Sequence, residues 1–353
     1  MHRKVLVAMS GGVDSSVTAY LLKKDGFDVT GLTMCFGIKG ESAKKEKCCT
    51  PRSVEDAKAV CHSLNIPHYV MDFSKELEEM VIDGFVSSYA RGKTPNPCVD
   101  CNRGLKFGVL LKKALSLDFD FLATGHYARI VKRRDSYILK KAKDRRKDQS
   151  YFLYCIRREA LKSILFPLGE LTKEEVRNIA KSAHLPVCDK SESQDICFIP
   201  DNNLQKFLSD RINRKTEEGS ILDTKDKILG NHKGAFFYTV GQRSGLGVGH
   251  RHALYVLAID TVANRLIVGE KNDLKSNGLV AEETNFLTGK IPREAFARIR
   301  YNHNEAKCRI SRKKGGVKVI FEKPQEAVTP GQSVVFYDKD IVLGGGVIEH
   351  VIR

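Results

Sequence analysis

A glycine-rich turn between an apolar strand and an amphipathic helix constrains the fold of this chain most. The segment KVLVA (4–8) predicts a strand, and SGGVDSS (10–16) follows almost at once. From Val13 onward, apolar residues recur at spacings of three and four until Gly26, which predicts a helix. Glycines at such a turn let the backbone approach a ligand, and the first N–H groups of the helix favour an anion. The turn therefore predicts a phosphate-binding loop, although a plain helix cap built from Asp14 and the serines has a similar pattern.

The chemistry of this loop differs from that of the common nucleotide hydrolases. The lysine of their G-x-x-x-x-G-K-[ST] phosphate loop is missing here. The loop instead offers serine hydroxyls as donors and the carboxylate of Asp14, which can hold a metal ion or orient donors. We expect a pyrophosphate-binding loop of another class.

The first half of the chain alternates predicted strands and helices. Strands are predicted at 27–34, over 67–73 and within 120–130, and a helix is predicted at 53–64. This alternation predicts an α/β fold, a doubly wound parallel sheet whose ligands lie beyond the carboxyl ends of the strands. From about 150 to 185 the pattern is helical, with a capping box from Thr172 to Glu175.

The second half changes character after about residue 220. It is rich in glycine and alternates apolar with polar residues, which predicts short antiparallel strands. We expect a catalytic α/β domain at 1–205, helical from about 150, then a small central β domain at 206–280 and a C-terminal β-barrel at 281–353.

Charge narrows the class of partner. The formal net charge is +16, which favours an anionic partner, nucleic acid before an acidic membrane surface. Nine of the sixteen residues 132–147 are Lys or Arg, and beside a nucleotide loop such a run favours phosphate contact over a merely solvated face. No apolar run reaches transmembrane length, and the first residues turn polar too soon for a signal peptide. We expect a cytoplasmic protein that does not bind a membrane.

The cysteines suggest reactive thiols or metal ligands. The chain has ten, and in such a protein disulfides are less expected than thiols. Cys98 and Cys101 form a C-x-x-C motif in TPNPCVDCNRGLKFG (94–108), where the prolines predict a loop and a helix is expected just after Cys101. Cys197 stands alone in SESQDICFIP. Together with Cys188, these cysteines could instead make a four-thiolate zinc site.

Eight short segments, in order along nearly the whole chain, resemble the tRNA-specific 2-thiouridylases of the ATP pyrophosphatase (PP-loop) superfamily. They are MSGGVDSS, GLTM, TPNPCVDCNRGLKFG, ATGHYAR, KDQSYFL, SQDICFIP, FYTVGQRSGLGVG and PGQSVVFYD. The resemblance implies a PP-loop, Rossmann-like fold and an enzyme that uses ATP and Mg²⁺. Such an enzyme replaces the C2 oxygen of the wobble uridine, U34, with sulfur in tRNAs for Lys, Glu and Gln. It also implies a sulfur donor, such as a cysteine desulfurase relay.

The resemblance further assigns roles to individual residues. The ATP-binding set is Ala8, Met9, Ser10, Gly11, Gly12, Val13, Asp14, Ser15, Met34 and Gly125. Cys101 corresponds to the nucleophilic cysteine, and Cys197 to the cysteine that carries the persulfide. The positions that contact the target base or the tRNA are Asn96, Pro97, Cys98, His126, Lys147, Asp148, Gln149, Arg300, Tyr301 and Gln332.

Cys98 departs from the family pattern, because many members have Asp at this position. In related tRNA-thiolating enzymes, a C-x-x-C motif and a distant cysteine hold a [4Fe–4S] cluster whose fourth iron binds sulfide. Cys98, Cys101 and Cys197 are therefore candidate cluster ligands. The third thiol favours this cluster over the persulfide route.

Both sulfur routes share the same activation step. A uridine C2 carbonyl has no leaving group, and adenylation of its oxygen supplies one that a sulfur nucleophile can displace. Two other classes stay open: a small-molecule adenylating amide synthetase of the same superfamily, and a zinc-containing, non-catalytic RNA-binding protein. The first leaves the basic charge and the cysteine pair unexplained, and the second leaves the intact loop unexplained.

Overall fold

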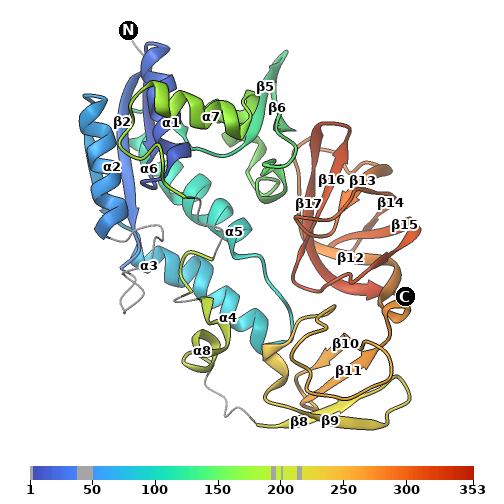
Figure 1. Ribbon diagram of the computed structural model, residues 1–353. Coiled ribbons are helices and arrows are strands. Elements are labelled where there is room, and N and C mark those ends of the chain that lie inside the picture. Colours follow the sequence, from blue (N-terminus) through green and yellow to red (C-terminus); the bar gives the residue numbers. More distant parts are fainter. Residues whose placement is uncertain (1–2, 38–50, 192–195, 200–201, 213–216) are drawn as a thin grey trace. The chain divides into compact units, whose positions relative to one another are not determined.

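The computed structural model describes residues 3–37, 51–191, 196–199, 202–212 and 217–353 (Figure 1). The chain forms two compact units. The N-terminal unit comprises Met1–Val81, Cys98–Asn202 and Asp340–Val342, and the C-terminal unit comprises Ile82–Pro97, Asn203–Lys339 and Leu343–Arg353. Within the described ranges, no helix is long and apolar enough to cross a bilayer.

The N-terminal unit is built on a five-stranded parallel sheet in the order β3–β2–β1–β4–β7. Its strands are β1 (Lys4–Ala8), β2 (Asp28–Cys35), β3 (His68–Asp72), β4 (Phe121–Ala123) and β7 (Ile164–Leu165). Val5 in the central strand pairs with Val29 on one side and Phe121 on the other. The chain therefore first winds outward from β1 to β3 and then resumes on the other side at β4. This confirms the predicted doubly wound sheet and places its topological switch point between β1 and β4.

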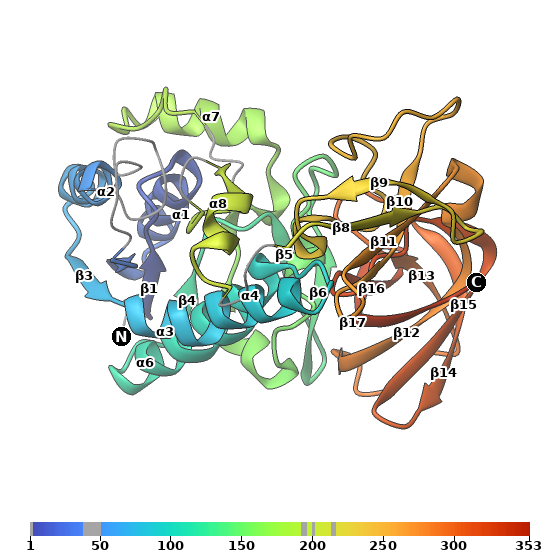
Figure 2. The same ribbon diagram turned by 90° about the horizontal axis from the view of Figure 1, so that it is seen from below.

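Helices cover both faces of this sheet. Figure 2 shows α1 (Val13–Lys24), α2 (Pro51–Ser63) and α7 (Lys173–Ser182) on one side and α6 (Leu111–Ser116) on the other. Val5 and Val7 share one apolar core with side chains of α1, α2 and α7, whereas Leu6 is buried outside that core. Successive strand side chains point to opposite faces, so this alternation fits a strand that is covered on both sides.

Short helical segments and one hairpin complete this part of the chain. The helical segments are α3 (Ser74–Leu77), the π-helix η2 (Glu78–Ile82), α5 (Pro97–Asp100), the π-helix η3 (Cys101–Leu110) and the 3₁₀ turns η4 (Ser150–Phe152), η5 (Arg158–Ser163) and η6 (Pro167–Glu170). Strands β5 (Ala128–Arg133) and β6 (Ser136–Lys141) form an antiparallel hairpin. Most of the basic run 132–147 lies on this hairpin and the turn after it.

Two predictions of local structure need correction. The sequence predicts a helical segment at 150–185, but only its last part, α7, is an α-helix. Local hydrogen bonds compete with an α-helix at the start of this segment, since Asp148 accepts from both the N–H and the hydroxyl of Ser150, two residues later. The helix expected just after Cys101 begins already at Pro97, because a proline fits the first helical position, where its missing N–H is not needed.

The C-terminal unit contains a small sheet in the order β10–β11–β8–β9. Its strands are β8 (Gly219–Leu222), β9 (Ile228–His232), β10 (Tyr255–Asp260) and β11 (Arg265–Gly269). The helices of the unit are α4 (Asp83–Ala90), α8 (Leu204–Ser209) and the 3₁₀ turns η8 (Ala235–Phe237) and η9 (Lys271–Leu274). The predicted small β domain is thus confirmed.

Six further strands form a closed antiparallel barrel. They are β12 (Lys275–Phe286), β13 (Glu294–Arg298), β14 (Ala306–Lys313), β15 (Gly316–Glu326), β16 (Ser333–Asp338) and β17 (Ile341–Ile352), in the order β12–β15–β14–β13–β16–β17. Pairing of β12 with β17 closes the barrel, and Val319, Phe336 and Ile348 are among its buried core. Closure removes free strand edges. The predicted C-terminal barrel is confirmed.

Candidate active site

The glycine-rich turn joins β1 to α1 and ends in an uncapped helix. Gly11 has φ +71°, and a Cβ there would lie 2.2 Å from the carbonyl oxygen of Ser53, so only glycine fits. Gly12 is the N-cap of α1 and provides no side-chain cap. The hydroxyls of Ser15 and Ser16 donate to the carbonyl oxygen of Gly12, at 3.1 and 2.8 Å. The turn is therefore not an ordinary Asp/Ser cap, and it leaves the N-terminus of α1 suited to an anion.

The neighbouring strands bring Met34 and Gly125 to the same edge of the sheet. Met34 lies near the end of β2, and Gly125 follows β4 by two residues. A Cβ on Gly125 would lie 2.9 Å from the main-chain carbon of Asp14 and from the nitrogen of Ser15. Gly125 is thus in close contact with the first turn of α1. Both residues of the predicted ATP set lie at the carboxyl edge of the sheet, where open α/β sheets bind ligands, and Gly125 follows the strand at the switch point.

A lysine that the sequence analysis did not single out lies at this loop. Lys173, the first residue of α7, places its Nζ 2.7 and 2.9 Å from the two carboxylate oxygens of Asp14. The hydroxyl of Tyr127 donates to Asp14 Oδ1 at 2.8 Å. The Lys173 side chain is 12% exposed and that of Asp14 33%. The capping box at Thr172 located the start of this helix, but nothing in the sequence linked it to the loop.

The C-x-x-C motif lies across α5 and the start of η3. Cys98 is exposed and Cys101 is half-buried. π-helical turns are rare and frequent at functional sites. Asn102, next to Cys101, donates from Nδ2 to the carbonyl oxygen of Phe152 at 3.0 Å, which ties this helix to a segment fifty residues later. Cys155 lies behind the motif, and burial raises the pKa of its thiol to about 12, so it stays a protonated core thiol.

The described residues contain no group of three His, Cys, Asp or Glu side chains that could hold a metal. Cys98, Cys101 and Cys197, the candidate cluster ligands, therefore do not form such a group, and adding Cys188 does not create one. Mg²⁺ on ATP needs only one or two carboxylates besides phosphate oxygens. At the loop, however, both oxygens of Asp14 accept hydrogen bonds from Lys173. These donors do not fit either a cluster or a magnesium ion in this arrangement, and we assign neither group a step.

His126 lies beyond β4 and is held in its neutral form. Burial, and then the nearby charge of Lys106, lower the pKa of His126 well below 6.5. Its Nδ1 shares a hydrogen bond with the Thr124 hydroxyl at 2.7 Å, and its ring contacts those of Phe107 and Phe166. A neutral imidazole at this position can donate and accept hydrogen bonds with a nucleobase. It has no positive charge with which to attract a phosphate.

The KDQ segment has a structural role that the sequence did not indicate. Asp148 is buried, and its carboxylate accepts hydrogen bonds from the N–H groups of Ala142 and Ser150. The Gln149 side chain accepts from the N–H of Tyr127 at 2.9 Å, and the main-chain N–H of Gln149 donates to the Tyr127 carbonyl oxygen. Gln149 thereby fixes the bend before β5 that carries Tyr127 beside the loop, and Asp148 holds the chain just after β6. Direct tRNA contact by Lys147, Asp148 and Gln149 stays a prediction.

The remaining predicted tRNA positions lie in the C-terminal unit. Gln332 donates from Nε2 to the carbonyl oxygens of Thr94 and Pro95, at 2.9 and 3.3 Å. It therefore anchors the segment that leads directly into Asn96 and Pro97. Arg300 and Tyr301 follow β13, where Arg300 is exposed and Tyr301 half-buried. The structure thus brings Gln332 and the Asn96 segment together, although they are far apart in the sequence.

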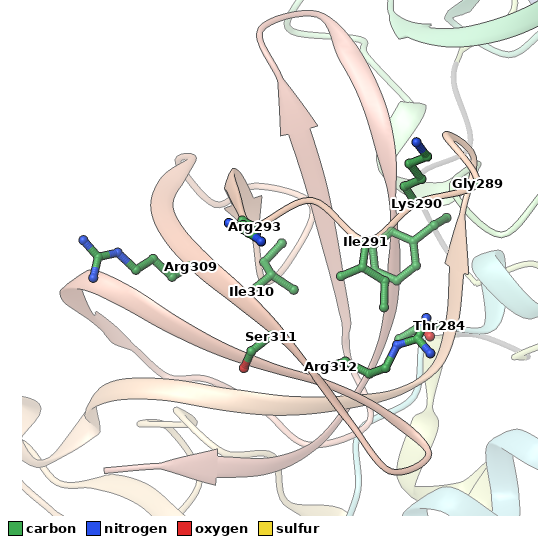
Figure 3. Close-up of a pocket in the computed structure, with 10 residues that line it drawn as sticks. Thr284, Gly289, Lys290, Ile291, Arg293, Arg309, Ile310, Ser311 and Arg312 are labelled. Carbon is green, nitrogen blue, oxygen red and sulfur yellow. The ribbon is translucent and has the colours of Figure 1, made fainter.

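The barrel also carries a basic pocket that the sequence analysis missed (Figure 3). It encloses about 910 Å³, and its cationic lining residues are Lys290, Arg293, Arg309 and Arg312. Arg309 is paired with Glu294 at 3.7 Å, while the other three have no carboxylate partner within the described ranges. Phe286 and Ile291 add apolar lining. Such a hollow fits an anion with an apolar part.

Comparison with known proteins adds three family models in chain order. The first, described as a tRNA methyl transferase HUP domain, matches residues 3–201. A tRNA methyl transferase PRC-barrel domain matches 205–270, and an aminomethyltransferase beta-barrel domain matches 276–348.

Similar proteins cover the full length of the chain. A protein of Syntrophus aciditrophicus (strain SB) named tRNA-specific 2-thiouridylase MnmA 1 is 51% identical over 353 residues, which is 100% of this chain and 94% of that protein. The tRNA-specific 2-thiouridylase MnmA of Carboxydothermus hydrogenoformans is 48% identical, with 99% of this chain and 98% of that protein covered. Among solved structures, a 4-thiouridine synthetase–RNA complex with bound ATP matches 59% of this chain and 50% of its own, with 16% identity and a TM-score of 0.39.

Proposed function

This chain belongs to the tRNA-specific 2-thiouridylase family, and we propose that it activates the C2 oxygen of the wobble uridine, U34, with ATP before sulfur replaces it. The observation that carries the proposal is the loop at the switch point of the N-terminal unit. There Gly11 and Gly125 let the backbone pack closely against Ser53 and the first turn of α1, and the N-terminus of α1 has no side-chain cap, so its N–H groups suit a phosphate chain. An adenylating enzyme needs such a site, whereas a plain RNA-binding protein does not.

The activation step answers the main chemical difficulty. The C2 carbonyl of uridine is a poor electrophile, and its oxygen is not a leaving group. Attack of this oxygen on the α-phosphate of ATP forms a C2–O–AMP bond and releases pyrophosphate. Sulfur then bonds to C2, and AMP leaves with the oxygen. Donors that are already oriented toward the pyrophosphate contribute most to such a step.

For the sulfur we propose the persulfide route. Cys197 carries a persulfide that a donor such as a cysteine desulfurase relay supplies, and its outer sulfur attacks C2 as AMP leaves. Cys101 acts as the nucleophile that then attacks Cys197 Sγ, which breaks the S–S bond and releases the 2-thiouridine. The resulting Cys101–Cys197 disulfide is reduced by a thiol reductant. Cys101 is half-buried beside the exposed Cys98 at the junction of α5 and η3. A cluster is less favoured, because Cys98, Cys101 and Cys197 do not form a metal-binding group within the described ranges.

The substrate is tRNA, and we propose those for Lys, Glu and Gln as the acceptors. The target base must leave the anticodon stack to reach the cysteines, because chemistry on C2 needs access to the ring. The formal charge of +16, the basic hairpin β5–β6 and the barrel pocket all favour contact with the RNA backbone. A tRNA substrate also favours a cytoplasmic location.

One experiment separates this function from its alternatives. Purified protein is given ATP and a sulfide or persulfide donor, with and without unmodified tRNA, and pyrophosphate release and 2-thiouridine are measured. We expect both products only when tRNA is present. Pyrophosphate release that does not depend on tRNA would support a small-molecule amide synthetase. Binding of tRNA with neither product would support a non-catalytic RNA-binding protein.

A further inference from the structure

The loop lacks a cation of its own. A bound triphosphate carries several negative charges, and common phosphate loops neutralise part of them with the lysine that SGGVDSS does not have. The N–H groups at the start of α1 supply only partial charges. A cation from elsewhere in the chain would complete this site.

Lys173 lies where that cation is needed. Its Nζ is 2.7 and 2.9 Å from the carboxylate oxygens of Asp14, a residue of the first turn of α1 that is 159 positions earlier in the chain. The Tyr127 hydroxyl donates to the same carboxylate, and the centre of the Tyr127 ring is 5.8 Å from Lys173 Nζ. The ammonium group is therefore held at the loop from two sides.

The stability of α7 does not explain a lysine at this position. Lys173 is the first residue of the helix, where the helix dipole disfavours a positive charge. The N-terminus of α7 is satisfied by other groups. Thr172 and Glu175 form a capping box, and the N–H of Lys173 donates to Asp144 Oδ2 at 3.1 Å. A residue that opposes a local preference, here the preference against positive charge at a helix N-terminus, and does not stabilise its own helix is a sign of function.

We propose that Lys173 is the cation that binds the β- and γ-phosphates of ATP and stabilises the pyrophosphate as it leaves. Asp14 and Tyr127 are positioning residues that hold its ammonium group over the loop before the nucleotide arrives. Lys173 acts through its charge and forms no covalent bond. The inference rests on the proposed function in one respect, since it takes ATP as the nucleotide.

The test compares two nucleotides that differ in the β- and γ-phosphates. Binding of ATP and of AMP is measured by calorimetry for the wild type, Lys173→Met and Lys173→Arg. We expect Lys173→Met to weaken ATP binding about tenfold or more, which is about 1.4 kcal/mol, and to leave AMP binding within about twofold. Lys173→Arg keeps the charge and should recover part of the ATP affinity. Lys181→Met, an exposed lysine in the last turn of the same helix, is the matched control and should behave like the wild type.

A purely structural ion pair gives a different result. Lys173→Met would then lower the melting temperature while ATP and AMP binding stayed equal to the wild type or fell together, and either outcome overturns the inference. Failure of the proposed function can be distinguished from failure of this inference. If the wild type binds ATP but does not thiolate tRNA, the function fails while the ATP-to-AMP comparison still decides the role of Lys173.

Discussion

Cys98 is the residue that distinguishes the two sulfur routes. Because the three cysteines do not form a metal-binding group within the described ranges, we expect Cys98→Ala to keep 2-thiouridine formation within a few-fold of the wild type. Cys101→Ala and Cys197→Ala should abolish it, since each removes a thiol that the persulfide route uses. The measurement is mass spectrometry of nucleosides from the modified tRNA, with iron content determined on anaerobically purified protein. Loss of both iron and activity in Cys98→Ala would contradict the persulfide route and support the cluster route instead.

Four histidines make the stability of the protein sensitive to mild acid. Burial is the main cause that lowers the pKa values of His68, His126, His232 and His303 below 6.5. In the unfolded chain these groups regain their ordinary pKa and bind protons that the folded protein does not. Stability is therefore full above pH 6.5 and falls as the pH drops below it.

Urea unfolding at about pH 7.5 and about pH 5.5 checks this expectation, with a lower midpoint at the lower pH. The carboxylates with lowered pKa values, such as Asp144 and Asp223, lose their contribution to stability only in more acidic solution. Their protonation therefore does not affect the comparison of these two pH values. An equal midpoint at both pH values would show that the histidines keep ordinary pKa values in the folded protein.

At the scale of the element, α7 carries a catalytic cation on a capped helix start. Thr172→Ala removes the hydroxyl that accepts from the N–H of Glu175 at 3.2 Å, and we expect a loss of about 1 kcal/mol of stability. Because the same turn positions Lys173, ATP binding should also weaken. Thermal unfolding and ATP calorimetry measure the two effects.

Asn203→Ala is the matched control for this cap. The Asn203 side chain caps α8 by accepting from the N–H of Lys206 at 2.9 Å, and α8 belongs to the C-terminal unit. This substitution should cost a similar stability and leave ATP binding unchanged. If both variants weaken ATP binding alike, the effect on Thr172→Ala reports general destabilisation.

At the scale of the whole molecule, we expect tRNA binding to depend on cations in both units. In the N-terminal unit Lys132, Arg133 and Arg134 are exposed at the hairpin and have no carboxylate partner within the described ranges, whereas Arg145 is paired with Asp340 at 2.5 Å. In the C-terminal unit Arg293 and Arg312 line the barrel pocket. We expect alanine at either group to weaken tRNA binding and to reduce its salt dependence by roughly 0.7 to 0.9 in slope for each phosphate that is no longer neutralised.

Binding of tRNA at a series of salt concentrations measures both effects. Lys307→Ala is the control for the barrel, because Lys307 lies on β14 with Arg312 but is paired with Glu322 at 2.6 Å. It should change neither affinity nor slope. An unchanged slope for the Arg293 and Arg312 variants would show that the barrel pocket does not contact RNA phosphates. An unchanged slope for the hairpin variants would show that the basic run is only a solvated face.

The sequence by itself determined the features that depend on neighbouring residues. The Gly11 turn, the capping box of α7 and the alternation of strands and helices follow from local sterics, local hydrogen bonds and the periodicity of apolar residues. These sufficed for the parallel sheet and the later β structure, and the resemblance of eight short segments indicated the family. The limits of the three domains, and the roles carried over to single residues, stay predictions.

Only the tertiary structure decided which distant groups meet. Lys173 reaches Asp14 because α7 and α1 share one apolar core on the same face of the sheet. Gln332 reaches Thr94 because the C-terminal unit includes both the barrel and the segment 82–97. The pocket cations come from the turn before β13 and from β14, which the antiparallel pairing of β13 with β14 brings together. Such contacts depend on how the chain folds in three dimensions. The spacing of residues along the sequence does not determine which distant residues then lie side by side.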